Sequence, residues 1–396
     1  MKKKKSFIIG GVTVVVAIIA TLILKNQFFA SANYSNDYNK TFGEFTANTT
    51  SKLIGDENEN TCYSPVSLFA ALTLMAETTE NDTREEILEV LGVSDISKLE
   101  EMYDTTLANL VVEYDEESKL TLCNSLWIQE NAVNDKFDSV SKTLKDTMEC
   151  EIYKNVDPIK VNEWVDTNTN HLIDKILDEE LNYALALVNT LYYKSAWRDE
   201  FSDVGSKEFC LEDGRKVSVD FIKNKKDTMK YSECEDYTVV SVPMDEGEMI
   251  FVLPDEDIKL SKLMKEKSLN EILALVTGND MEEGKVSISI PKYEISYNMS
   301  DGLKDTLESL GAKKMFSSDC EWTILDNVPE AYINQKVKFV LDENGIEAAA
   351  VTSIGVPLGK DESTIDLEIS LDRPFMYILM KEDIPLFIGN VYNPKK

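Results

Sequence analysis

The chain has 396 residues, of which 43% are apolar, so it has enough apolar side chains for a sizeable core and is not a disordered chain. Asp and Glu number 72 against 41 Lys and Arg, which gives a formal net charge of -31. This charge disfavours partners that bind through Lys and Arg, namely nucleic acid, heparin-like polyanions and anionic lipid. The single histidine, His171, excludes histidine-rich metal centres, and we expect no cofactor and no metal.

The N-terminal segment has the pattern of an export signal. Lysines at residues 2–5 precede an uncharged apolar stretch at residues 7–24, and the small-residue run Ala30-Ser31-Ala32 follows. The apolar length fits both a short transmembrane anchor and a signal-peptide core, and Ala-Ser-Ala fits a cleavage site, so both interpretations stay open. Either one places the rest of the chain outside the cytoplasm, secreted or tethered to the outer side of the membrane by residues 7–24.

Helical periodicity dominates the first half of the chain and strand patterns the second. Apolar spacing predicts helices over residues 38–53, 67–78, 83–91 and 160–177. β-Branched and aromatic runs bounded by turn signals predict strands over residues 185–193, 237–242, 248–253, 286–290, 337–341 and 375–380. This order favours an α+β layer arrangement over a parallel βαβ sheet.

The chain after the export segment shows no sign of a domain boundary. It has no linker rich in Pro, Gly or Ser and no internal repeat, so we expect residues 1–32 to be a signal or anchor and residues 33–396 to be a single domain. The cysteines are widely spaced and form no CxxC pair, which favours free thiols, although the compartment also permits disulfides.

A segment of small residues follows the predicted strand at 337–341. Residues 342–345 predict a turn, and residues 348–352 contain no bulky side chain. Alternation places Ile346, Ala348, Ala350 and Thr352 on one face, which is suited to burial in a core. Residues 357–364 then predict an exposed polar loop. The small-residue segment itself is compatible with either a strand or a loop.

Two motifs occur in a fixed order near the C-terminus. Residues 343–350 read Glu-Asn-Gly-Ile-Glu-Ala-Ala-Ala, and the second motif combines residues 372–377 with a block at 385–391. The first resembles the hinge and the second the C-terminal signature of the serpins, a family of suicide protease inhibitors. The resemblance extends from about residue 38 to the end and suggests an exported, bacterial-type member.

The resemblance implies a serpin fold with three β-sheets, about eight or nine helices and an exposed reactive-centre loop at about residues 343–368. It also implies an inhibitor and not an enzyme, acting as a monomer. A target serine protease would cleave the loop and remain attached as a covalent acyl-enzyme while the hinge inserts into the main sheet. The alternative is a non-inhibitory serpin-fold binding protein whose loop is a substrate or a switch.

The hinge must slide between strands, so its inward side chains must be small or apolar. The resemblance assigns the hinge to Glu343, Gly345, Ile346, Glu347, Ala348, Ala349, Ala350, Val351 and Thr352. Ile346 departs from the family's usual small hydroxyl residue, and we expect its bulk to slow the first step of insertion. The family's usual spacing puts the scissile bond after Gly359, but the following segment is longer than usual. The bond is therefore expected within a window formed by Leu358, Gly359, Lys360 and Asp361.

Other residues are assigned structural roles by the resemblance. Ser64, Ser67 and Asn189 would form a hydrogen-bonded shutter below the opening strands. Gln335 occupies the position where the family usually has histidine, so the shutter would not titrate. Glu343 and Lys292 would pair near the top of the sheet, and Trp197 would cover the point where insertion begins. Membrane contact is expected only through the N-terminal segment.

Overall fold

The computed structural model describes residues 36–54, 59–107, 110, 112–113, 118–178, 184–224, 227–278, 280–326, 335–346 and 364–395. The expected signal or anchor lies outside these ranges. The same holds for Glu347, Ala348, Ala349, Ala350, Val351 and Thr352 of the expected hinge and for Leu358, Gly359, Lys360 and Asp361 of the expected cleavage window. Among the described residues, no helix combines the length and apolarity needed to cross a bilayer.

Nine α-helices lie within the described ranges, and five of them precede residue 150, as the sequence pattern predicts. They are α2 (Asn36–Leu53), α3 (Pro65–Thr78), α4 (Asn81–Leu91), α5 (Ile96–Met102), α6 (Phe137–Met148), α7 (Pro158–Asn168), α8 (Leu260–Leu263), α9 (Glu266–Thr277) and α10 (Ser300–Leu310). Helix α3 begins at a Ser64 cap whose hydroxyl accepts a hydrogen bond from the Ser67 amide at 3.0 Å. Nearly all side chains of α3 are buried, so it forms part of the core.

The helix predicted over residues 160–177 is wrong beyond the end of α7. His171 adopts a positive φ of 63°, and the chain folds back along the helix. Asn162 holds the returning segment, because its Nδ2 donates to the Leu177 carbonyl at 3.0 Å and its Oδ1 accepts from the Leu177 amide at 2.9 Å. The apolar periodicity continues in the sequence since the returning residues pack against the same cluster as α7.

The described strands form two sheets. The smaller sheet has seven strands, in the order β12 (Tyr293–Asn298), β13 (Lys336–Leu341), β14 (Gly345–Ile346), β5 (Leu185–Ala196), β3 (Lys119–Ile128) and β2 (Val112–Glu113), with β4 (Glu151–Tyr153) also paired to β3. Its centre is the long antiparallel pair of β3 and β5.

The larger sheet has ten strands in the described part of the chain. Their order is β1 (Thr61–Tyr63), β17 (Ile384–Val391), β16 (Phe375–Lys381), β10 (Glu248–Pro254), β9 (Tyr237–Pro243), β8 (Asp227–Glu233), β11 (Glu282–Pro291), β7 (Lys216–Asn224) and β6 (Phe201–Cys210), with β15 (Leu367–Ser370) parallel to β11. The α+β class is confirmed. The third expected sheet is continuous with the second, because β11 pairs with β8 along its first half and with β7 along its last residues.

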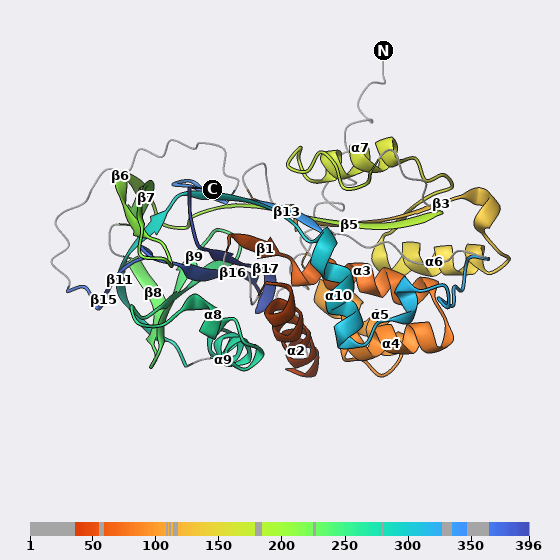
Figure 1. Cartoon of the computed structure of the whole chain (residues 1–396), viewed down its shortest axis with the longest axis horizontal. Coiled ribbons are helices and arrows are strands. Elements are labelled where there is room, and N and C mark those ends of the chain that lie inside the picture. The colour runs from red at the N-terminus through yellow and green to blue at the C-terminus, as the bar shows by residue number, and fades with distance from the viewer. Residues whose placement is uncertain are drawn as a thin grey trace, which may run out of the picture. The chain divides into compact units, whose positions relative to one another are not determined.

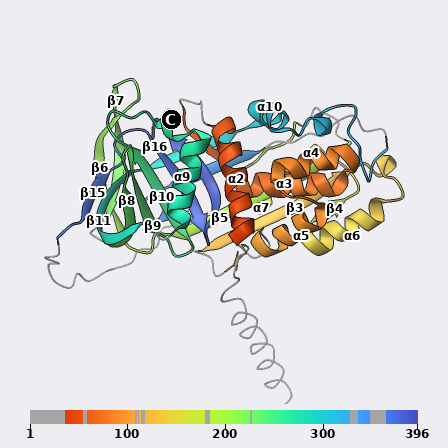
Figure 2. The same ribbon diagram turned by 90° about the horizontal axis from the view of Figure 1, so that it is seen from below.

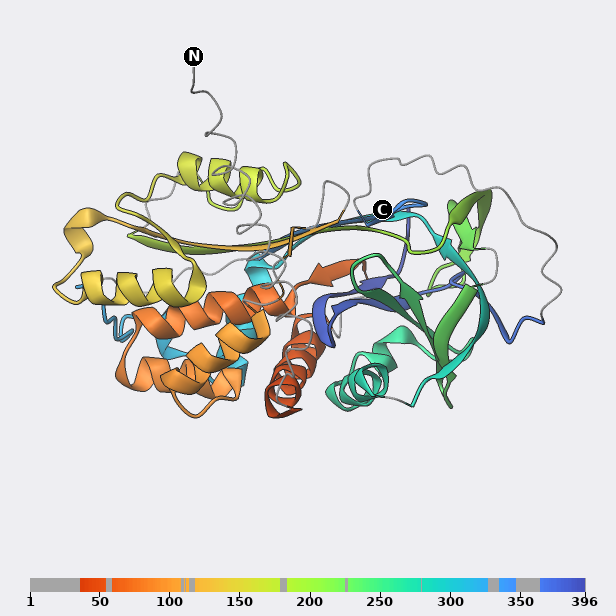
Figure 3. The ribbon, with the colours of Figure 1, turned by 180° about the vertical axis from the view of Figure 1, so that it is seen from behind.

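The sheet that contains β3 and β5 is covered on both faces. Figures 1 and 3 show α7 over one face and α3, α5 and α6 on the opposite side. Seen from below in Figure 2, these helices gather at one end, whereas β6, β8 and β11 lie at the other. The described residues after Asn36 belong to one compact unit. The central strands are therefore held between helices while their ends reach towards the larger sheet.

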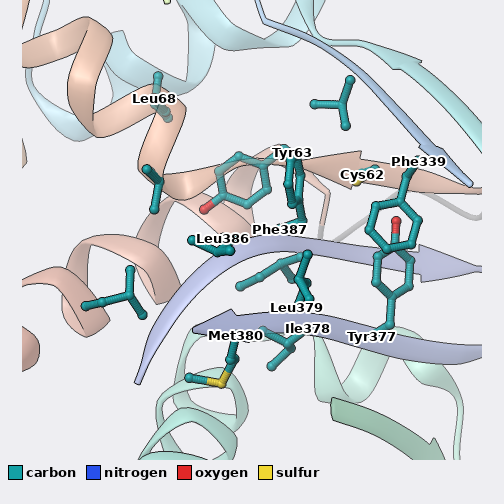
Figure 4. Packing of buried hydrophobic residues seen from close by; sticks show 14 of the residues in the cluster. Cys62, Tyr63, Leu68, Phe339, Tyr377, Ile378, Leu379, Met380, Leu386 and Phe387 are labelled. Atoms are coloured by element: carbon teal, nitrogen blue, oxygen red, sulfur yellow. The ribbon is translucent and has the colours of Figure 1, made fainter. Parts of the chain in front are cut away.

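The two sheets are joined by an aromatic cluster in the core (Figure 4). The ring of Phe339 on β13 lies 4.9 Å from that of Tyr377 on β16 and 6.0 Å from that of Phe387 on β17. All three side chains are buried, and such ring contacts add to the free energy gained by burying their area. Strand β13 is thus held against the larger sheet, so its position on one side of β14 is fixed.

Candidate functional site: the interrupted sheet and its hinge

The strand β14 has two residues and lies between two longer strands. Ile346 faces Leu341 of β13 on one side and Ser195 of β5 on the other. In the part of the chain that the structure describes, β13 and β5 are connected only through β14, although they contain 6 and 12 residues. The sheet therefore has flanking strands for a longer central strand than the one it holds.

Gly345 adopts a conformation that only glycine adopts without strain. Its φ is +140°, and the carbonyl and amide groups of Asp342 close a turn on it, with the Asp342 amide donating to the Gly345 carbonyl at 3.0 Å. A Cβ atom at this position would lie 2.8 Å from the Ala196 Cα and closer still to the Ser195 carbonyl oxygen. The close approach of the two backbones lets Ile346 enter the sheet, where its side chain is 3% exposed.

Trp197 holds the turn that precedes β14. Its indole Nε1 donates to the Asp342 carbonyl at 2.9 Å, and its amide donates to the Asn344 carbonyl at 3.1 Å. The side chain is buried and packs on Phe201, with 4.9 Å between the ring centroids. Trp197 therefore covers the start of β14, which is the position that the resemblance implies.

Lys292 connects the hinge to a second carboxylate that the sequence does not reveal. Its ammonium lies 2.7 Å from a carboxylate oxygen of Glu343 and 2.7 Å from one of Asp203 on β6. Hydrogen bonding to Lys292 lowers the pKa of Glu343 and also that of Asp203. All three side chains are partly exposed, so these ion pairs fix geometry more than they stabilise the fold.

The expected shutter residues come together near the middle of β5. The Ser67 hydroxyl donates to the Asn189 side-chain oxygen. Gln335 makes two hydrogen bonds to the backbone of Ser64, accepting from its amide at 2.9 Å and donating to its carbonyl at 3.0 Å. A neutral amide thus satisfies a donor and an acceptor at once, which a histidine ring at this position would do only in one tautomer.

Asn124 on β3 extends the shutter by one residue. It lies directly opposite Asn189, whose Nδ2 donates to the Asn124 side-chain oxygen at 2.8 Å. The Asn124 Nδ2 donates in turn to the Tyr103 hydroxyl at 2.7 Å and to the Met148 carbonyl at 3.0 Å. No motif marks Asn124 in the sequence, since its role depends on the pairing of β3 with β5.

The described ends on either side of residues 347–363 are anchored in different sheets. Ile346 belongs to the seven-stranded sheet, whereas Leu367 of β15 pairs with Val286 of β11 in the ten-stranded sheet. The intervening segment contains the expected cleavage window and connects two fixed points. In the intact chain, the segment that follows β14 is therefore attached at its far end to the other sheet.

Comparison with known proteins identifies the family. A family model described as Serpin (serine protease inhibitor) matches residues 40–394. The chain belongs to the serpin family. Members of this family generally act as protease inhibitors and not as enzymes, and their typical partners are serine proteases.

Relatives and solved structures agree with this assignment. Neuroserpin of Mus musculus is 26% identical over 382 residues, covering 90% of this serpin and 92% of the relative. An alpha-1-antitrypsin-like protein of Tamias sibiricus is 30% identical over 353 residues, covering 85% and 83%. The native state of the thermophilic serpin tengpin superposes with a TM-score of 0.80 at 24% identity, covering 92% and 96%. Thyroxine-binding globulin in complex with thyroxine superposes with a TM-score of 0.76 at 22% identity, covering 90% and 99%.

The structure places the predicted residues of this serpin in two groups along β5. Glu343, Gly345, Ile346, Trp197 and Lys292 meet at the end of the strand, and Ser64, Ser67, Asn189 and Gln335 meet near its middle. Ser195 lies six positions along β5 from Asn189, or about 20 Å of extended chain. The roles of both groups in loop insertion remain predictions.

The single histidine forms a surface ion pair, and the two most buried cysteines have inert thiols. His171 is exposed, and its Nδ1 lies 2.6 Å from a carboxylate oxygen of Asp166, which is a surface pair. The cysteines are free, all six lying within the described ranges, and two of them, Cys62 and Cys150, are buried. Burial raises the pKa of each of these two thiols to about 12, so both are inert at neutral pH.

Proposed function

We propose that this serpin is an irreversible, suicide-type inhibitor of serine endopeptidases that acts by cleavage of its reactive loop and insertion of the hinge into the seven-stranded sheet. The observation that supports this most strongly is the two-residue strand β14 between the longer β13 and β5. A strand that has already started between two flanking strands needs only release of its far end to grow.

Cleavage provides that release. The protease serine attacks the carbonyl carbon of the scissile bond, the ester of the acyl-enzyme forms, and the amine of the downstream residue leaves with a proton. The downstream fragment stays paired to β11 through β15. The upstream fragment, with the protease attached to its new end, is then free to move away from β15 and into the sheet.

The register of β14 predicts the position of every inserted residue. Because Ile346 pairs with Ser195 in an antiparallel ladder, residues 347–356 would lie opposite residues 194–185 of β5. Ala350 would face Leu191, and Thr352 would face Asn189 in the shutter. Full insertion along β5 would therefore place the end of the inserted segment about 33 Å from Ile346 along the strand, at about 3.3 Å for each residue.

The side chains suit this register. Ser195, Leu191 and Leu187 point to the same face of β5, and the two leucines pack against the main core while only partly buried. The inserted residues that share this face are Ile346, Ala348, Ala350, Thr352, Ile354 and Val356, none of them charged. Insertion would cover apolar surface that the present sheet leaves accessible, which favours it.

Glu347 is the charged residue nearest to the point of insertion, and the register places it on the other face, opposite Lys194. A carboxylate directly across from an ammonium on neighbouring strands is a favourable pair. Ile346, whose bulk we expected to slow the first step, is already buried between Leu341 and Ser195. We infer that its burial precedes cleavage, so that its size is accommodated before the reaction starts.

Export places the inhibitor where extracellular proteases act. The lysines before the apolar stretch at residues 7–24 and the run Ala30-Ser31-Ala32 support an extracytoplasmic location, secreted or tethered by its N-terminal segment. The side chain before the scissile bond selects the protease. Leu358 would suit a chymotrypsin- or elastase-like enzyme and Lys360 a trypsin-like one.

The test is to mix the full chain with trypsin-, chymotrypsin- and elastase-like proteases and to separate the products on a denaturing gel. For at least one protease we expect a covalent band at the mass of the protease plus the upstream fragment, because the small downstream fragment separates under denaturing conditions. N-terminal sequencing of the small released fragment should then give a start between Gly359 and Glu362. Cleavage in this window by every protease, with no covalent band from any of them, would refute the proposal.

That negative result would favour the alternative of a non-inhibitory serpin-fold binding protein. The likeness to thyroxine-binding globulin in complex with thyroxine shows that this fold is compatible with a bound small molecule in that protein. In this case the loop would act as a substrate or a switch, and cleavage would not extend β14.

A further inference from the structure

The end of β5 is attached to the turn that connects β9 and β10. The Tyr193 hydroxyl donates to the Glu246 carbonyl, and the Glu246 amide donates to the Ser195 hydroxyl at 3.0 Å. The Asp245 amide donates to the Ala196 carbonyl at 3.0 Å. These three contacts fix the last residues of β5 to a turn of the other sheet.

The attachment continues into the chain that follows β5. Trp197 forms an isolated antiparallel bridge with Met244, the first residue of the turn. The amide of Arg198 donates to the Pro243 carbonyl at 3.2 Å, and its guanidinium donates to the Met244 carbonyl at 3.3 Å. The strand end and the turn therefore move as one unit.

A buried ammonium holds this turn in place. The Lys381 Nζ, at the end of β16, lies 2.7 Å from a carboxylate oxygen of Glu246. The Lys381 side chain is 4% exposed and that of Glu246 is 22% exposed, which makes this pair far more buried than the two pairs of Lys292. An ammonium so far from water requires a partner, so the pair constrains where the turn can lie.

Packing on the outer side of the turn is incomplete. A cavity of about 450 Å³ is lined by Glu246, Gly247, Lys381 and residues of the neighbouring strands. Gly247 has a φ of +93°, and its backbone approaches the Met380 carbonyl so closely that a Cβ atom would clash with it. The turn is thus attached to the end of β16 by a close backbone contact and an ion pair, and the cavity lies beside both of them.

We propose that Lys381 is a positioning residue for loop insertion. It acts through Glu246 to keep the end of β5 fixed beside β14 while β14 is extended. Ser195 and Ala196, the residues tied to the turn, are the same residues that pair with Ile346 and Gly345. The inference rests on the proposed inhibitory function. If the end of β5 becomes mobile, the first steps of insertion are slower, so more acyl-enzyme hydrolyses before the protease is trapped.

The test compares the wild-type chain with Lys381→Met, which removes the charge and keeps an unbranched chain of similar length. One readout is the stoichiometry of inhibition, meaning the molecules of inhibitor consumed for each protease trapped. The other is the rate of protease association. We expect the stoichiometry to rise at least threefold and the association rate to stay unchanged, because binding of the loop precedes insertion.

Further variants separate positioning from loss of stability. Lys381→Arg retains a buried cation and should restore the wild-type stoichiometry, whereas Glu246→Gln should reproduce the defect without changing volume. Lys262→Met removes an exposed ion pair of equal length, 2.7 Å to Asp236, at the opposite end of β9, and should change nothing. Ile272→Val lowers stability through the core of α9 and should lower the melting temperature without changing the stoichiometry.

Hydrogen exchange of the intact inhibitor tests the attachment without any protease. In Lys381→Met, the amides of Asp245 and Glu246 should exchange at least tenfold faster than in the wild type. Unchanged exchange overturns the proposal, and so does faster exchange with unchanged stoichiometry, because the turn would then move without affecting insertion. If the wild type forms no covalent complex, the proposed function fails, and the exchange result alone decides whether Lys381 holds the end of β5.

Discussion

The substitution Gly345→Ala tests the geometry on which insertion depends. A Cβ atom at this position meets the Ala196 Cα at 2.8 Å and the Ser195 carbonyl oxygen closer still, at a φ of +140°. Strain of this kind costs about 1–3 kcal/mol, and overpacking against backbone costs about the same again. Release of β14 from the sheet would relieve both.

The free energy needed to release β14 sets an upper limit on how far the substitution can destabilise the fold. Ile346, now 3% exposed, would return to water at a cost of about 2 kcal/mol, and the hydrogen bonds around the Asp342 turn would add about 1 kcal/mol each. We therefore expect Gly345→Ala to lower the free energy of unfolding by about 2–4 kcal/mol. The expected structural sign is faster hydrogen exchange at the amide of Trp197, which donates to the Asn344 carbonyl.

Gly302→Ala is the matched control, because a Cβ atom there meets no other atom within 4 Å and the φ is not strained. It lies in α10, where alanine is favoured over glycine, so its stability should stay equal or rise slightly. The assay is urea unfolding followed by circular dichroism, together with exchange measured by mass spectrometry. Equal unfolding midpoints and equal exchange for the two variants would show that Gly345 is not held between β13 and β5 as described.

Two further predictions concern a buried acid and the face of the hinge. Burial raises the pKa of Glu77 to about 7, with Glu100 adding repulsion, so ionisation destabilises the folded state. The resulting decrease in the free energy of unfolding is absent below about pH 4.3, near the pKa of the carboxyl in the unfolded chain. It is complete above about pH 7, where it amounts to about 3 kcal/mol. Glu77→Gln should therefore raise the urea midpoint at pH 8.5 and leave it unchanged at pH 4, and an equal effect at both values would contradict the assignment. Ala350→Arg would place a charge opposite Leu191 on the core face, so we expect cleavage without a covalent complex on a denaturing gel. The matched control is Ala349→Glu, whose new carboxylate would face a cavity of about 440 Å³ beside Tyr192 that two lysines line. This variant should still trap the protease. Equal trapping by both variants would refute the register.

The sequence predicts the order of elements well where periodicity is local. Helices α2, α3 and α4 and strands β5, β9, β10, β11, β13 and β16 lie where the patterns place them. The extension of α7 to residue 177 fails because packing of a returning segment against a helix gives the same apolar spacing as the helix itself. The alternation that puts Ile346 on an inward face agrees with its burial, since a period of two is set by strand geometry alone.

Residues that act through pairing between distant segments could not be predicted. Asp203 is one of many acids in an acidic chain, and only the fold brings it to Lys292. Lys381 lies in a strand whose other side chains are apolar, yet nothing in the sequence shows that its ammonium is buried against Glu246. The motifs thus indicate where the hinge is, whereas the contacts that hold its surroundings depend on tertiary structure.

Thermal unfolding of the intact chain and of the chain cleaved within the expected window, residues 358–361, tests insertion most directly. A protease that is not trapped would make the cut, and both fragments would stay together. A central strand of about ten residues adds ten or more ladder hydrogen bonds at about 1 kcal/mol each, so we expect the cleaved form to unfold more than about 10 °C higher. A cleaved form that unfolds at the same temperature as the intact chain, or lower, would contradict the insertion of the hinge between β13 and β5.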